Sequence, residues 1–142
     1  MKQYLLDTSV VLDLLLNRQP WAADAAVIWD AHRQQQIRAW IAAFTVSTIH
    51  YVVRKQAGIA AAQSAVRACV TTLDIAPTQH ATLLAADALA GSDFEDDLQI
   101  ASAVQAGVDA IVTRDPKGFA ASPIAVLTPA DLAASLPAPP TP

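Results

Sequence analysis

The stretch YLLDTSVVLD, residues 4–13, decides the fold. Its short apolar run ends at Asp7, and apolar residues then recur at helical spacing after Thr8 and Ser9, either of which can cap a helix. The stretch therefore predicts a buried strand that leads directly into a helix. The same order of strand and helix repeats along the rest of the chain.

Four further strands are predicted at residues 38–44, 73–75, 110–113 and 124–127. Helices are predicted at residues 21–36, 59–70, 78–89 and 93–106, from Thr45 or Ser47 to about Gly58, and after the Thr128-Pro129 cap. Strands that alternate with helices imply parallel crossover units. We expect an α/β fold, a three-layer α/β/α domain over residues 1–136 with a central, mainly parallel sheet of four to five strands. The Pro-rich residues 137–142 are expected to form a disordered tail.

Composition narrows the class of protein. The chain has 142 residues, the size of one domain. It contains 31 alanines and only 6% aromatic residues, which favours packed helices. No apolar run approaches the roughly 18 residues that cross a bilayer, and Asp7 interrupts any signal-type core, so we expect a cytoplasmic protein with no membrane contact. The lone cysteine, Cys69, sits among apolar residues and is expected in the core.

Charge is distributed unevenly along the chain, although the net charge is only −4. Residues 1–67 carry seven Lys or Arg and four Asp, a net charge of +3, whereas residues 68–142 carry two Lys or Arg and nine Asp or Glu, a net charge of −7. A basic region beside an acidic one suits a site that gathers cations and presents them to a polyanion. Two ordinary solvated faces would give the same pattern.

Acidic residues stand where an α/β fold gathers its functional groups. These lie beyond the carboxyl ends of parallel strands, and Asp7 and Asp115 each follow a predicted strand. Residues 93–97, DFEDD, add four acids at the start of a helix. If these acids converge, each like-charge pair costs on the order of 1 kcal/mol in water and several times that in a less polar cleft. Mg²⁺ or Mn²⁺, which take oxygen ligands, would relieve that repulsion.

Each acid also has a purely structural explanation. Asp7 and Asp93 each precede a predicted helix and could simply cap it, and the acids after Asp93 suit the positive end of a helix dipole. Asp115, before a proline, is typical of a turn. Asp13 lies about 600° around a helix from Asp7 and is treated as a surface acid. Only the conjunction of the acids points to a metal site.

Three segments together resemble the PIN domain, the nuclease fold shared by the toxins of bacterial VapBC toxin–antitoxin pairs. They are residues 4–13, residues 93–103 (DFEDDLQIASA) and residues 110–119 (AIVTRDPKGF), and residues 123–132 also fit. The resemblance covers nearly the whole domain. It implies a PIN-like fold and a Mg²⁺- or Mn²⁺-dependent endoribonuclease that hydrolyses RNA phosphodiester bonds as the toxin of such a pair.

The resemblance also assigns roles to individual residues. In the family, acids at the ends of the first and fourth strands and on nearby helices bind the metal ion. The matching catalytic and metal-binding positions here are Asp7, Asp96 and Asp115, with Asp93 as an accessory metal ligand. Ser9 and Thr113 are expected to orient a water or the neighbouring carboxylates.

One position departs from the family pattern. Members with the full acidic set carry Glu or Asp about three residues before an aromatic such as Tyr51, where this chain has Thr48, kept here as an accessory residue. No acid occurs between Asp30 and Asp74 to replace it. The chain could therefore be a catalytically degenerate PIN-like module that binds nucleic acid or protein. A receiver-type phosphotransfer domain ranks lower, because no second acid stands beside the acid of the first strand.

Basic side chains supply the candidate contacts to RNA phosphates, and they are Arg18, Arg33, Arg38, Arg54, Lys55 and Arg114. Arg54, Lys55 and Arg114 form the RNA-binding prediction, which implies binding that weakens as salt rises. The resemblance further implies a homodimer and a small antitoxin that fills the cleft. Three tryptophans, Trp21, Trp29 and Trp40, could line such a contact, although core packing is the better expectation for at least two of them.

Overall fold

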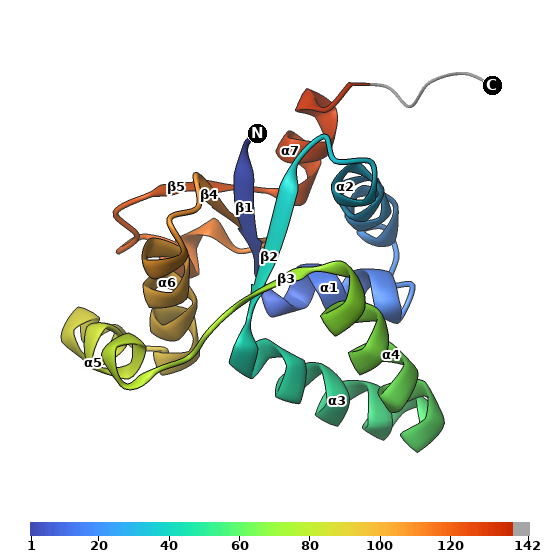
Figure 1. Cartoon of the computed structure of the whole chain (residues 1–142), viewed down its shortest axis with the longest axis horizontal. Coiled ribbons are helices and arrows are strands. Elements are labelled where there is room, and N and C mark those ends of the chain that lie inside the picture. Colours follow the sequence, from blue (N-terminus) through green and yellow to red (C-terminus); the bar gives the residue numbers. More distant parts are fainter. Residues whose placement is uncertain (138–142) are drawn as a thin grey trace.

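A five-stranded parallel sheet forms the centre of the protein in a computed structural model that describes residues 1–137. The strands are β1 (Gln3–Leu6), β2 (Arg38–Ala42), β3 (Asp74–Ala76), β4 (Ala110–Val112) and β5 (Ala125–Leu127). Their order across the sheet is β3-β2-β1-β4-β5, and every pairing is parallel (Figure 1). This confirms the predicted α/β class and puts β1 next to β4, so the residues that follow these two strands become neighbours.

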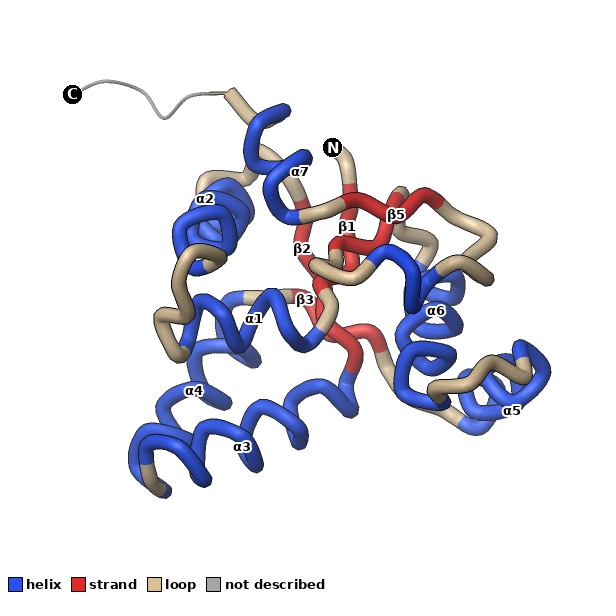
Figure 2. Tube along the Cα trace, turned by 180° about the vertical axis from the view of Figure 1, so that it is seen from behind, coloured by secondary structure: helices blue, strands red, loops and turns tan. Residues whose placement is uncertain are grey.

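Helices cover both faces of the sheet. They are α1 (Thr8–Leu15), α2 (Ala22–Arg33), α3 (Ala43–Ala57), α4 (Ile59–Thr72), α5 (His80–Leu89), α6 (Phe94–Ala106) and α7 (Pro129–Ser135), with a 3₁₀-helix η1 (Pro116–Phe119). Helices α1 to α4 lie on one side of the sheet, and α5 and α6 lie on the other, as both views show (Figures 1 and 2). The architecture has the three layers that the alternating pattern predicts.

Each face of the sheet has its own hydrophobic core, because side chains alternate along a strand. Tyr4 and Leu6 pack with apolar residues of α1, α2, α3, α4 and α7, whereas Leu5 packs with residues of α6 and η1. Strand β4 is buried at all three residues, as expected for a central strand covered on both faces. Cys69 is fully buried in the first of these cores, as predicted.

Several local signals are confirmed in detail. Gly107 ends α6 with φ of 71°, the left-handed conformation that glycine adopts easily. The Thr128 hydroxyl accepts a hydrogen bond from the Asp131 N–H at 3.1 Å and caps α7. Asp93 caps α6, since its carboxylate accepts from the N–H groups of Glu95 and Asp96.

Three local predictions were wrong. Helix α1 begins at Thr8 with Asp7 at its N-terminal cap position, so neither Thr8 nor Ser9 caps it. The strand predicted at residues 38–44 ends at Ala42, and the following helix begins at Ala43 rather than at Thr45 or Ser47. Ala42 is the last residue of β2 that pairs with β3, and alanine is the best helix former, so the helix starts as soon as the pairing ends. Thr45 does not cap α3 but is buried in its first turn. The 3₁₀-helix η1 was not predicted.

None of the helices in residues 1–137 is both long enough and apolar enough to cross a bilayer. Beyond Pro137, the tail predicted at residues 137–142 lies outside the described part of the chain.

Candidate functional site

Asp7 stands at the end of β1, where its N–H donates to the carbonyl of Val112 in the adjacent strand β4 at 2.9 Å. It occupies the N-terminal cap position of α1, but its side chain makes no capping hydrogen bond. The interpretation of Asp7 as an ordinary helix cap is therefore wrong. Its carboxylate is left to face other side chains.

Three side chains donate to the Asp7 carboxylate. Gln99 Nε2 lies 3.0 Å from Oδ1, and the hydroxyls of Thr113 and Ser9 lie 2.8 and 3.0 Å from Oδ2. A carboxylate has about four acceptor positions, so these donors hold the orientation of Asp7 and leave an acceptor position open on Oδ1. Two of the three predicted accessory residues, Ser9 and Thr113, thus contact Asp7 directly.

Gln99 is a residue of this site that our sequence reasoning missed. It is fully buried in α6 and also donates to Thr8 Oγ1 at 3.1 Å, and that hydroxyl shares a 3.0 Å hydrogen bond with Thr45 of α3. Its Oε1 has no partner among the described residues. The available signal was its position three residues after Asp96, on the same helical face and within an apolar stretch.

Asp96 and Asp115 approach each other at η1. A Cβ placed on Gly118 would lie 2.8 Å from Asp96 Oδ2 and 3.3 Å from Asp115 Oδ2, so both carboxylates face the same backbone position. The Thr113 hydroxyl accepts from the Asp115 N–H at 3.1 Å while it donates to Asp7. One hydroxyl therefore connects Asp7 to the turn that carries Asp115.

The electrostatics of the site show crowded negative charge. Burial, followed by the charges of Asp93, Asp7, Glu95 and Asp115, raises the pKa of Asp96 from 3.8 to about 6. Burial and the charges of Asp93 and Asp7 also raise the pKa of Glu95. The predicted acids Asp7, Asp93 and Asp115 thus each act through space on Asp96, as acids around a cation site do.

The chemistry of this donor set fits a hard divalent cation. Carboxylate oxygens are the preferred ligands of Mg²⁺ and Mn²⁺, and a cation would offset the repulsion that, together with burial, raises the pKa of Asp96. Within residues 1–137, however, no three His, Cys, Asp or Glu side chains already surround one cation position. Ligation by the acids would therefore need side-chain rotation, which the half-buried Asp96 and exposed Asp115 allow.

The remaining acids near the start of α6 have other partners. The Asp93 carboxylate accepts from two backbone N–H groups as the helix cap, which limits what it can offer as an accessory ligand. Asp97 is buried and accepts from the Gly91 N–H at 2.9 Å. Thr48 lies half-buried on α3, one turn after Thr45 and on the same helical face.

Asp13 is not the surface acid that we expected. Only 1% of its side chain is exposed, and it forms ion pairs with Arg114 and Arg18. A buried carboxylate needs such partners, and here they come from distant parts of the chain.

Four of the six candidate phosphate contacts are paired with acids. Arg18 and Arg114 contact Asp13, Arg33 contacts Asp30, and Arg38 contacts Asp74. Within the described residues, Arg54 and Lys55 have no acidic partner; both are exposed in the last turn of α3, with the Lys55 ammonium 5.6 Å from the Tyr51 ring centroid. Trp29 and Trp40 are partly buried against the two cores, whereas Trp21 is exposed.

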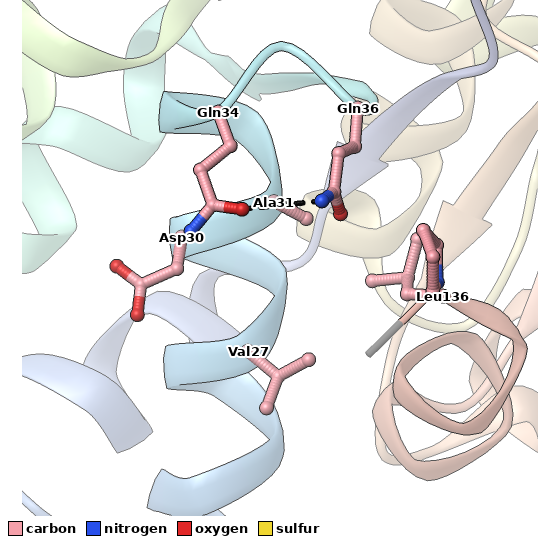
Figure 3. A pocket seen from close by; sticks show the side chains of 7 residues that line it. Val27, Asp30, Ala31, Gln34, Gln36 and Leu136 are labelled. Atoms are coloured by element: carbon pink, nitrogen blue, oxygen red, sulfur yellow. Dashed lines mark hydrogen bonds between the residues drawn. The ribbon is translucent and has the colours of Figure 1, made fainter. Parts of the chain in front are cut away.

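A separate hollow lies away from these acids. Figure 3 shows this space of about 90 Å³ between α2 and the residues after α7, with Val27, Ala31 and Leu136 on its walls. None of the predicted site residues lines it. The acid cluster, rather than this hollow, is the candidate functional site.

The fold is similar to that of solved toxin structures. The match to DNA-bound VapBC from Salmonella typhimurium has a TM-score of 0.73 at 14% identity and covers 91% of this chain and 99% of that chain. VapC20 from Mycobacterium tuberculosis, described as a sarcin–ricin loop cleaving toxin, matches with a TM-score of 0.68 at 16% identity, over 83% and 94% of the two chains. A toxin–antitoxin complex from Klebsiella pneumoniae matches with a TM-score of 0.67 at 22% identity, over 89% and 97%. No curated protein sequence matches this chain.

A sequence profile of the PIN domain matches residues 3–117. That range contains β1 to β4, the helices between them and every acid of the candidate site. The protein therefore belongs to the PIN-domain family.

Proposed function

We propose that this protein is a Mg²⁺- or Mn²⁺-dependent endoribonuclease and the toxin of a toxin–antitoxin pair. The observation that carries the proposal is the convergence of Asp96 and Asp115 on Gly118, beside an Asp7 whose orientation three donors hold. Burial, together with the charges of four neighbouring acids, raises the pKa of Asp96 to about 6. Such an arrangement is unfavourable unless a cation offsets it.

Asp7, Asp96 and Asp115 would hold the cation, with Asp93 as an accessory ligand. A bound divalent cation acidifies a water molecule and offsets the charge of the scissile phosphate. The protein's own residues set the geometry: Gln99 and Thr113 orient the Asp7 carboxylate. Because a proton on Asp96 competes with the cation, binding should weaken as the pH falls below about 6.

RNA binding is assigned first to Arg54 and Lys55. They lie on α3, within a stretch from residue 31 to residue 73 that carries no acid, which favours contact with a polyanion. Arg114 is a weaker candidate because its guanidinium already contacts Asp13. The description of VapC20 as a sarcin–ricin loop cleaving toxin favours RNA as the substrate.

The relatives also suggest partners. Similar chains were solved as VapBC and toxin–antitoxin complexes, which supports a small antitoxin as the partner of this chain. A homodimer and a cytoplasmic location complete the proposal.

The test is cleavage of structured and single-stranded RNAs with Mg²⁺ or Mn²⁺. Asp7→Asn and Asp115→Asn should each lower the rate by about 100-fold or more. Asp30→Asn is the matched control, because it removes the same charge from an exposed ion pair on α2 and should leave the rate unchanged. Equal activity of the wild type, Asp7→Asn and Asp115→Asn would contradict the proposal.

Thr48 supports a second candidate, a catalytically degenerate module that binds nucleic acid or protein. The family's usual acid is missing at that position, and the other acids do not yet surround a cation. Calorimetric titration with Mn²⁺ separates the two candidates. Binding that Asp7→Asn abolishes supports the nuclease, and no binding supports the module.

A further inference from the structure

An ion pair between buried Asp13 and half-buried Arg114 connects α1 to the turn between β4 and η1. Arg114 Nε lies 2.6 Å from Asp13 Oδ2, and Arg114 Nη2 lies 3.1 Å from Asp13 Oδ1. Arg114 thus uses two donors on both oxygens of one carboxylate, a geometry that fixes the plane of the guanidinium as well as its position. Arg18 Nη1, 3.8 Å from Asp13 Oδ1, adds a second positive charge.

The Trp21 ring also contacts the Arg114 guanidinium. Arg114 Cζ lies 4.0 Å from the centroid of the Trp21 ring, within the range of a cation–π contact. The two hydrogen bonds to Asp13 and the cation–π contact with Trp21 together restrict the conformation of the Arg114 side chain. Its backbone is correspondingly anchored to the layer formed by α1 and α2.

The anchored residue stands between two residues of the candidate site. Thr113 precedes it and donates to Asp7, whereas Asp115 follows it and faces Asp96 at Gly118. The hydrogen bonds within the turn itself are local: the Asp115 N–H donates to the Thr113 hydroxyl, and the Gly118 N–H donates to the Asp115 carbonyl at 3.2 Å. Anchoring Arg114 therefore restricts the backbone from which the Asp115 carboxylate projects.

We propose that Asp13 is a positioning residue that acts through Arg114 to hold Asp115 toward Asp96 and Gly118. The inference rests on the proposed nuclease function for its consequence in catalysis, but its structural part is testable without it. Asp13 itself is buried, and the proposed role requires no contact of Asp13 with RNA or the cation.

The first experiment is amide hydrogen exchange of the whole protein, with Asp13→Asn compared with the control Asp30→Asn. We expect the Asp115 and Gly118 amides to exchange about 10-fold faster or more in Asp13→Asn, while amides of β1 and β2 change by no more than the loss of global stability requires. Unchanged exchange at both amides, or an increase equal to that of the strands, would overturn the proposal.

Arg114→Lys provides a second variant in case Asp13→Asn folds poorly. Lysine keeps the positive charge against Asp13 but cannot place two donors on both oxygens. It should therefore also speed exchange at Asp115 and Gly118. If Asp115 and Gly118 exchange at the wild-type rate in Arg114→Lys, a positive charge at position 114 is enough to hold the turn, and the two hydrogen bonds of Arg114 to Asp13 are not needed.

The second experiment measures Mn²⁺ affinity and the kinetics of RNA cleavage. Loss of a residue that orients a ligand typically costs 10–100-fold in metal affinity or activity, so Asp13→Asn should weaken Mn²⁺ binding or lower kcat by about that factor. KM for RNA should stay within about 2-fold. A change in KM alone would instead make Arg114 a phosphate contact and overturn the positioning role.

The two experiments test the proposed function and the positioning role of Asp13 independently. If the wild-type protein neither binds Mn²⁺ nor cleaves RNA, the proposed function is wrong, and the exchange rates at Asp115 and Gly118 still decide whether Asp13 holds the turn.

Discussion

Asp96→Asn should stabilise the cation-free protein at pH 8, although most substitutions destabilise proteins. The pKa of Asp96 is raised from 3.8 to about 6 by burial and by four neighbouring acids. Each pH unit of that difference corresponds to about 1.4 kcal/mol, so roughly 3 kcal/mol is the upper bound. The side chain is partly exposed to solvent, which screens the charges, and the first turn of α6 favours a negative charge by about 0.5 kcal/mol. We expect a net gain of about 1 to 2 kcal/mol.

The difference in stability between Asp96→Asn and the wild type depends on pH. Below about pH 3, Asp96 is protonated in both the folded and the unfolded state, and the variant and the wild type should be equally stable. Between about pH 3 and pH 6 the unfolded wild type ionises first, so the wild type loses stability progressively. Above the folded pKa of about 6 the difference becomes constant.

The assay is thermal unfolding in a chelating buffer at several pH values. For a domain of this size the gain corresponds to a rise in Tm of about 3 to 6 °C at pH 8. Added Mn²⁺ should make the wild type more stable than Asp96→Asn. A ligand at 100 times its Kd stabilises the protein that binds it by about 2.7 kcal/mol, and the variant should bind Mn²⁺ less tightly. Asp30→Asn, which changes the net charge equally, should stay within about 0.5 kcal/mol of the wild type. The reasoning is refuted if Asp96→Asn is no more stable than the wild type at pH 8, or if the difference is the same at pH 4 and pH 8.

Three further predictions concern the site and the core. Gly118→Ala should weaken Mn²⁺ binding by about 10-fold with almost no change in Tm, because its Cβ displaces only the movable ends of the Asp96 and Asp115 side chains; unaltered affinity in calorimetry would contradict this. Thr48→Glu should tighten Mn²⁺ binding by about 10-fold, roughly 1.4 kcal/mol, whereas its exposed neighbour Ser47→Glu should not, and equal effects would count against a role for position 48. The buried thiol of Cys69, whose pKa is raised by desolvation to about 11, should resist a thiol reagent at pH 8 until the protein is denatured; rapid labelling of the folded protein would show the burial to be wrong.

Part of the candidate site was predictable because strand ends in a parallel sheet share one edge. Asp7 and Asp115 follow β1 and β4, which lie side by side in the sheet, and the acids of residues 93–97 follow the glycine break before α6. Their mutual effect on the pKa of Asp96 agrees with the predicted convergence. The assignment of individual metal ligands stays a prediction.

Other parts of the site were beyond sequence reasoning, because they depend on contacts between elements far apart in the chain. Asp13 was taken for a surface acid, since nothing in its own segment shows that Arg114 would reach it from the turn after β4. Gln99 was not singled out from the sequence, because only the packing of α6 against β1 brings it to Asp7. The role of Gly118 depends on the carboxylates of Asp96, on α6, and Asp115, in the turn after β4, which are far apart in the chain.

The sequence by itself determined the α/β class, the approximate positions of the strands and most helices, and several caps, such as Thr128 and Gly107. These features depend on hydrophobic period and on hydrogen bonds between residues a few positions apart. Only the tertiary structure decided which polar side chains are buried and paired, because that depends on the order of strands in the sheet and on which helix faces meet. The pairing of buried Asp13 with Arg114 is one such result.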